Sequence, residues 1–78
     1  MKANSDFGKV VITLDEVIKE RGLSKSKVAF RAEIYRQQLN NYISGNIQRL
    51  DMSLLARLCY ALDCSLSDIV KYVPPEEG

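Results

Sequence analysis

Apolar residues recur every three or four positions over most of this chain, which is the spacing of one face of an α-helix. The clearest stripe lies between residues 52 and 62, where Leu54, Leu55, Leu58, Cys59 and Leu62 fall on one side. Residues that favour helix ends bound each such segment. The pattern predicts five helices, at about 14–21, 25–32, 35–44, 52–62 and 66–71.

Residues that cap helices stand at these boundaries. Ser24 and Asp51 precede two of the helices, and their side-chain oxygens can accept hydrogen bonds from the free N–H groups of the first turn. Gly22 and Gly45 follow two others, where glycine takes a left-handed conformation without strain. Two pairs have the spacing of a reciprocal capping box: Thr13 with Glu16, and Ser65 with Asp68.

The two ends of the patterned region differ from the helices. The β-branched stretch KVVIT, residues 9–13, predicts a short strand, and VKYV, residues 70–73, can pair with it as a small ribbon. A chain of 78 residues suits one domain. We expect that domain to span 9–73, between flexible tails at 1–8 and 74–78.

Only two or three residues separate the helices predicted at 25–32 and 35–44, which forces a sharp corner. Val28 and Ala32 would face the core, and Ala29 is small enough to let the second helix approach. Ile34 would fill the corner, and Leu39 and Tyr42 would pack the second helix on the domain.

Amides dominate the polar residues of the predicted helix 35–44. Successive residues lie about 100° apart around a helix. Arg36, Gln37, Asn40, Asn41 and Ser44 then share one arc, and Tyr35, Leu39, Tyr42 and Ile43 share the other. Guanidinium and amide groups match the donors and acceptors of base edges in the DNA major groove. The simpler alternative is an ordinary solvated polar face.

Charge is unevenly distributed, although the net charge is only +1. Residues 19–49 hold seven cations and two anions, a net of +5, and the rest of the chain holds four cations and eight anions, a net of −4. A basic middle with acidic flanks favours a polyanionic partner. An uneven solvated surface is the alternative.

Other chemistry finds little support in the sequence. Cys59 and Cys64 are the only cysteines and there is no histidine, so we expect no zinc site and read both thiols as core residues. We expect no catalytic site, cofactor or small-molecule substrate, because no nucleophile stands beside a base. Without a signal peptide or an apolar stretch of membrane-spanning length, the expected location is the cytoplasm.

The stretch from Leu14 to Ile69 resembles the helix-turn-helix domain of Xre/Cro-type, lambda-repressor-like regulators. The resemblance rests on GLSKSKVA, then IYRQQLNNYISG, then LARLCYALDCSLSDIV, in that order and spacing. It implies an all-α, compact five-helix lambda-repressor-like domain, with the small terminal ribbon as a possible addition. One position departs: the corner usually carries glycine, and Glu33 stands there. Either Glu33 is strained or the corner has another geometry.

The resemblance also implies roles for individual residues. Arg36, Gln37 and Asn41 match positions that touch bases. Asn40 shares their arc and is predicted to read bases with them, although its position more often supports such contacts. The predicted contacts to the DNA backbone are Lys25, Lys27, Tyr35, Gln38, Ser44 and Arg49.

The sequence therefore predicts a regulator that binds specific double-stranded DNA, in the first place a repressor, with residues 35–44 in the major groove. Few cations lie in the footprint, so we expect a homodimer that holds two half-sites. The alternative is a helix-turn-helix module that binds a protein, such as an antitoxin-like partner, and the two roles can coexist.

Overall fold

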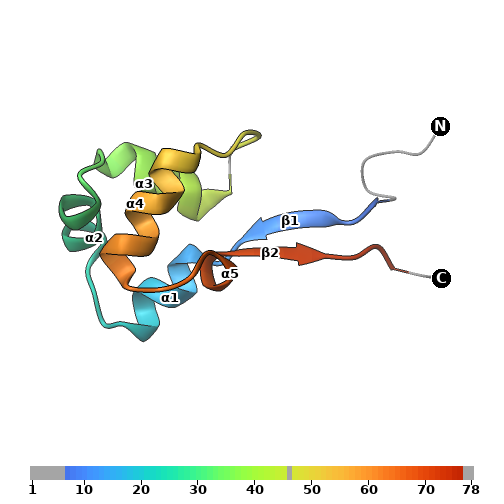
Figure 1. The fold of residues 1–78 in the computed structure, drawn as a ribbon, viewed down its shortest axis with the longest axis horizontal. Coiled ribbons are helices and arrows are strands. Elements are labelled where there is room, and N and C mark those ends of the chain that lie inside the picture. The colour runs from blue at the N-terminus through green and yellow to red at the C-terminus, as the bar shows by residue number, and fades with distance from the viewer. Residues whose placement is uncertain (1–6, 46, 77–78) are drawn as a thin grey trace.

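The computed structural model describes residues 7–45 and 47–76 of the chain, which form a helical body with a projecting ribbon (Figure 1). The elements follow the order β1 (Lys9–Ile12), α1 (Leu14–Glu20), α2 (Lys25–Ala32), α3 (Arg36–Ser44), α4 (Met52–Leu62), α5 (Leu66–Ile69) and β2 (Val70–Val73). The predicted five helices and terminal ribbon are confirmed within these residues. Of the predicted tails and of the loop after α3, residues 1–6, 77–78 and Asn46 lie outside the described part.

Each of the five helices contributes side chains to one core. Leu14, Val28, Leu39, Leu58 and Ala61 have no exposed surface. The predicted core residues of α2 and α3 are all buried, and Ile34 packs against them partly buried. Cys59 and Cys64 are free thiols that pack half-buried against this core. Burial raises the pKa of the Cys64 thiol, and nearby Cys59 and Asp68 raise it further, so the thiol stays protonated.

The ribbon brings the two ends of the domain together. β1 and β2 are antiparallel, with Val10 opposite Tyr72 and Ile12 opposite Val70. This pairing corrects the helix predicted at 66–71, because Val70 already has extended backbone angles and joins β2. The helix ends at Ile69, where long-range strand pairing takes over from the local helical pattern.

The predicted Thr13–Glu16 capping box is wrong. Thr13 does not have the extended backbone of an N-cap, and its side chain accepts no hydrogen bond from α1. Its hydroxyl instead donates to the Asp68 carbonyl at 2.8 Å, and its N–H donates to the Ile69 carbonyl at 2.8 Å. Thr13 therefore joins the start of α1 to the end of α5.

The other predicted helix starts are capped as expected. Ser24 Oγ accepts from the Lys27 N–H at 3.1 Å, and Asp51 Oδ1 accepts from the Leu54 N–H at 3.1 Å. At α5, Asp68 Oδ2 accepts from the Ser65 N–H and hydroxyl, both at 3.0 Å. These two hydrogen bonds hold the pKa of Asp68 below its ordinary value of 3.8.

Glu33 keeps the left-handed conformation that the corner between α2 and α3 requires, with φ 56° and ψ 47°. The Ile34 N–H donates back to the Ala29 carbonyl at 3.1 Å and closes the end of α2. Arg57 on α4 donates to the Glu33 carbonyl at 2.9 Å. The corner therefore has the sharp geometry, and Glu33 carries the strain.

Glu33→Gly should stabilise the fold, because it removes the cost of a side chain in the left-handed region. That cost is about 1–2 kcal/mol, and the extra freedom of glycine in the unfolded chain offsets about 0.5–1 kcal/mol of it. We expect a net gain of roughly 0.5–1 kcal/mol in urea unfolding. Asp63→Gly, at φ 51°, is the matched control and should gain less, because aspartate tolerates this region better. An unchanged or lower stability of Glu33→Gly would contradict the strain.

Asp68→Asn should flatten the acid side of the stability profile. Because the folded pKa of Asp68 lies below its ordinary value of 3.8, its contribution is present above that pH and is lost as the pH falls through the folded pKa. The variant should be less stable than the native chain at neutral pH, and the difference should shrink toward low pH. Chemical unfolding measured across this range checks it, and a pH-independent difference would show that the charge is not responsible.

Candidate nucleic-acid interface

The side chains of α3 separate into two faces, as the sequence predicts. Leu39 and Tyr42 are 0% and 5% exposed, and Ile43 is partly buried against the core. The outward face consists of exposed polar side chains: Arg36, Gln37, Asn40, Asn41 and Ser44. The structure therefore brings the four predicted base-reading residues together on one solvent-facing surface.

α3 is held in place by buried side chains on its apolar side and by a hydrogen bond near its C-terminal end. Leu39 is fully buried, and the Tyr42 ring is buried with its hydroxyl still partnered. That hydroxyl accepts from the Asp51 N–H at 3.0 Å, which joins α3 to the residue that caps α4. The polar face therefore stands on a rigid support.

Arg36, the first residue of α3, is held by a residue that the sequence analysis did not single out. Its Nη1 donates to Ser26 Oγ, in the first turn of α2, at 2.6 Å. The two residues are ten positions apart, and only the sharp corner brings them together. Ser26 lies within the segment GLSKSKVA, and the one hint of its role in the sequence is a small hydroxyl residue at the start of the preceding helix.

Tyr35 and Gln38 form the start of α3. Tyr35 is the N-cap with extended backbone, so the helix begins one residue later than predicted. Gln38 Oε1 accepts from the Tyr35 N–H at 2.9 Å, and the Gln38 residue is exposed. The Tyr35 side chain is 80% exposed beside the polar face.

The start of α2 adds cations to this surface. Lys25 is half-buried and Lys27 is exposed, next to the capped N-terminus of the helix. From Lys25 to Ser44 the chain holds four cations and one anion, a net of +3. Across the described ranges, Lys19 with Asp15 is the only ion pair, so Lys25, Lys27 and Arg36 are not neutralised by carboxylates there.

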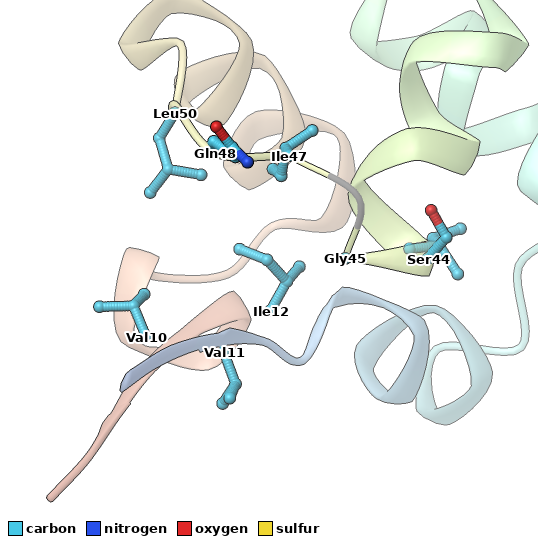
Figure 2. Close-up of a pocket in the computed structure, with 9 residues that line it drawn as sticks. Val10, Val11, Ile12, Ser44, Gly45, Ile47, Gln48 and Leu50 are labelled. Carbon is cyan, nitrogen blue, oxygen red and sulfur yellow. The ribbon is translucent and has the colours of Figure 1, made fainter. Parts of the chain in front are cut away.

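The remaining predicted contacts lie at the far end of α3. Arg49 is exposed in the loop between α3 and α4. Ser44 is also exposed, but its hydroxyl donates to the Asn41 carbonyl at 3.1 Å. Ser44 further lines a groove of about 510 Å³ between this loop and β1 (Figure 2). Ser44 therefore stands at the border between the polar face and the groove.

Within the described residues, no group of His, Cys, Asp and Glu side chains could hold a metal ion. Over the same ranges, no helix is long and apolar enough to cross a membrane. The arrangement on α2 and α3 offers cations, amides and helix N–H groups, which are the groups that contact phosphates and base edges.

Transcriptional regulators are among the known proteins that are similar to this chain. The sequence is 26% identical over 68 residues to an uncharacterized helix-turn-helix-type transcriptional regulator, YozG, of Bacillus subtilis (strain 168), and the match covers 87% of this chain and 81% of YozG. The fold is similar to the crystal structure of the transcriptional regulator VanUg, with a TM-score of 0.68 at 15% identity. That match covers 95% of this chain and 97% of VanUg.

The profile of the Cro/C1-type helix-turn-helix DNA-binding domains matches residues 13–75, which is most of the chain. This match confirms the resemblance that the residues of α2, α3, α4 and α5 carry. The chain belongs to the family of Cro/C1-type helix-turn-helix DNA-binding domains.

Proposed function

We propose that this protein binds a specific double-stranded DNA sequence as a homodimer and represses transcription there, with a lambda-repressor-like arrangement that inserts α3 into the major groove. The observation that carries the proposal is the outward face of α3, where Arg36, Gln37, Asn40 and Asn41 stand exposed on a buried support. Repression is the simpler outcome, because occupying a promoter is enough to block it.

The chemistry of α3 suits base reading. Arginine can donate twice to guanine O6 and N7, and asparagine or glutamine can pair with adenine N6 and N7. Arg36, Gln37 and Asn41 are the proposed base readers, joined by Asn40. Ser26 holds the Arg36 guanidinium at 2.6 Å, which limits the rotamer freedom that binding would otherwise cost.

Contacts to the DNA backbone come from both sides of α3. We propose that Lys25, Lys27 and the N–H groups at the start of α2 contact one strand, and that Arg49 contacts the other. Tyr35, the Gln38 amide nitrogen and Ser44 border the reading face and complete the proposed backbone contacts. Two free thiols fit the reducing conditions of the cytoplasm, where we place the protein.

A protein-binding role has one observation in its favour. Phe30 and Tyr60 are 82% and 77% exposed, and they border a shallow groove of about 360 Å³ with Arg31 and Glu33. Exposed aromatic side chains beside charges are typical anchors for a protein partner. This surface lies outside the polar face of α3 that we propose reads DNA, so a partner bound there could coexist with DNA binding.

Selection from a randomised duplex pool tests the function directly. A sequence with twofold symmetry should be enriched, and its affinity should fall steeply as salt rises. Failure to enrich any sequence would exclude specific DNA reading and leave the protein-binding role.

Arg36→Ala should weaken discrimination at one base pair of each half-site by about 1–3 kcal/mol, because a bidentate contact to guanine is lost. Dissociation constants on the selected sequence and on single-base variants measure this. Arg31→Ala, an exposed cation on the last turn of α2, is the matched control and should leave base preference unchanged. Ser26→Ala should weaken discrimination at the same base pair by a smaller amount. Added to Arg36→Ala, it should cause no further loss of discrimination. Equal base preference in the native chain and Arg36→Ala would remove Arg36 from the reading role.

Lys25→Ala should weaken binding equally on selected and scrambled DNA, because a phosphate contact carries no sequence information. The slope of log affinity against log salt should fall by about 0.9 per protomer, the value for one released counterion. Salt titrations of both duplexes check this, and Lys19→Ala, whose cation already pairs with Asp15 at 3.1 Å, serves as the control. A change confined to the selected sequence would show that Lys25 reads bases instead.

A further inference from the structure

The solvent-facing side of α4 is apolar, although the opposite side of the helix already packs on the core. Met52, Ala56 and Tyr60 follow one another at intervals of four residues, so they form one stripe along the helix. All three are exposed, Met52 by 84% and Tyr60 by 77%. Arg57 is the one charged residue of α4. A helix that is apolar on both sides is normally buried on both, so the outer stripe is typical of a surface that another protein covers.

A shallow groove continues this stripe onto the end of α2. One part of the groove, of about 360 Å³, lies between Phe30 and Tyr60, and a second part, of about 260 Å³, includes Ala56. Arg31, Glu33 and Tyr60 line both parts, which therefore adjoin. We name the groove and the outer stripe together the α2–α4 surface; it comprises Phe30, Arg31, Met52, Ala56, Arg57 and Tyr60, with Glu33 at its border.

Positive charge predominates at the α2–α4 surface. Arg31 and Arg57 line the groove with one carboxylate, Glu33. Neither arginine is in an ion pair, because Lys19 with Asp15 is the only one among the described residues. Arg57 Nη1 donates to the Glu33 carbonyl at 2.9 Å, which holds the guanidinium at the wall of the groove. Apolar side chains flanked by carboxylates would therefore complement this surface in both polarity and charge.

The shape of the α2–α4 surface favours a helix as its occupant. From Met52 to Tyr60 the stripe is about 12 Å long, at about 1.5 Å per residue, which is a little over two helical turns. An amphipathic helix lies along such a stripe with its residues i, i+3, i+4 and i+7. The surface consists of two helices and the corner after α2, so it offers no strand edge with which an extended segment could pair.

Other occupants match the surface less well. A second copy in a symmetric contact would bring Arg31 and Arg57 toward the same arginines of its partner. DNA phosphates would meet the two arginines but leave the apolar stripe exposed. The chain's own β2 lies toward the opposite end of the molecule from α2 (Figure 1), so the described part of the acidic C-terminal tail does not cover the surface.

We propose that the α2–α4 surface binds an acidic amphipathic helix of another protein. The apolar side of that helix lies on Phe30, Ala56 and Tyr60, and its carboxylates pair with Arg31 and Arg57. This partner chemistry rests on the protein-binding role proposed above and on no DNA contact. None of the proposed base-reading residues belongs to the surface, so the bound helix leaves the polar face of α3 available.

Selection from a displayed library of randomised peptides, each long enough for about four helical turns, tests the surface with the full native chain as the bait. Enriched peptides should carry apolar residues at helical spacing with carboxylates beside them. A synthetic peptide of the enriched sequence should bind Tyr60→Gln and Phe30→Gln at least about tenfold more weakly than the native chain, because an aromatic anchor is lost. Arg31→Gln should weaken binding and reduce its dependence on salt.

Matched controls come from exposed residues outside the surface. Tyr35→Ser removes an aromatic ring that is 80% exposed but keeps a hydroxyl at the N-cap of α3, and Arg49→Gln removes an exposed cation. Both should leave the dissociation constant of the peptide unchanged. A version of the peptide with lysine in place of each glutamate and aspartate should bind the native chain at least about tenfold more weakly, because the arginines would then face like charge.

Several results would overturn the proposal: no enriched peptide, peptides without acidic residues or helical spacing, or equal binding to the native chain and Tyr60→Gln. Circular dichroism melting of each variant separates lost binding from lost folding. DNA measurements keep the two proposals apart. The peptide should not compete with the selected duplex, and competition would place it on α3 instead. Peptide binding by a chain that prefers no DNA sequence would refute the proposed DNA reading and leave the α2–α4 surface standing.

Discussion

The corner between α2 and α3 sets the direction of every side chain on the polar face of α3. It depends on a left-handed Glu33, whose carbonyl is held by Arg57 at 2.9 Å, and on the Ile34 N–H, which closes α2 on the Ala29 carbonyl. Ala29 is small enough for α3 to approach, and Ile34 fills the space beneath the turn. A strained residue can persist there because the helices on both sides fix its position.

A second left-handed residue ends α4 in the same way. Asp63 has φ 51°, and Arg21, the residue that ends α1, donates to its carbonyl at 3.2 Å. In both places an arginine from another element binds the carbonyl of a helix-terminating residue. Charge-assisted hydrogen bonds of this kind stabilise helix ends that a small domain with limited buried surface needs to keep fixed.

The polar face of α3 is held in position by the packing of the opposite side of the helix on the core. α3 is held by Leu39 and Tyr42 on its apolar side and by the Tyr42 hydroxyl at its far end. Thr13 closes the other side of the domain by joining α1 to α5, from which the ribbon projects. The polar face of α3 and the groove bordered by Phe30 and Tyr60 therefore occupy separate parts of one body.

The sequence by itself determined the features that depend on neighbours along the chain. Helix positions, the Ser24 and Asp51 caps and the two faces of α3 follow from side-chain spacing within one or two turns, because helical hydrogen bonds join residues four apart. The tertiary structure alone decided contacts between distant segments. It shortened α5 through strand pairing at Val70, moved the Thr13 hydroxyl to Asp68, 55 positions away, and placed Ser26 against Arg36. Those contacts depend on how helices pack around a corner, which no local pattern of polar and apolar residues specifies.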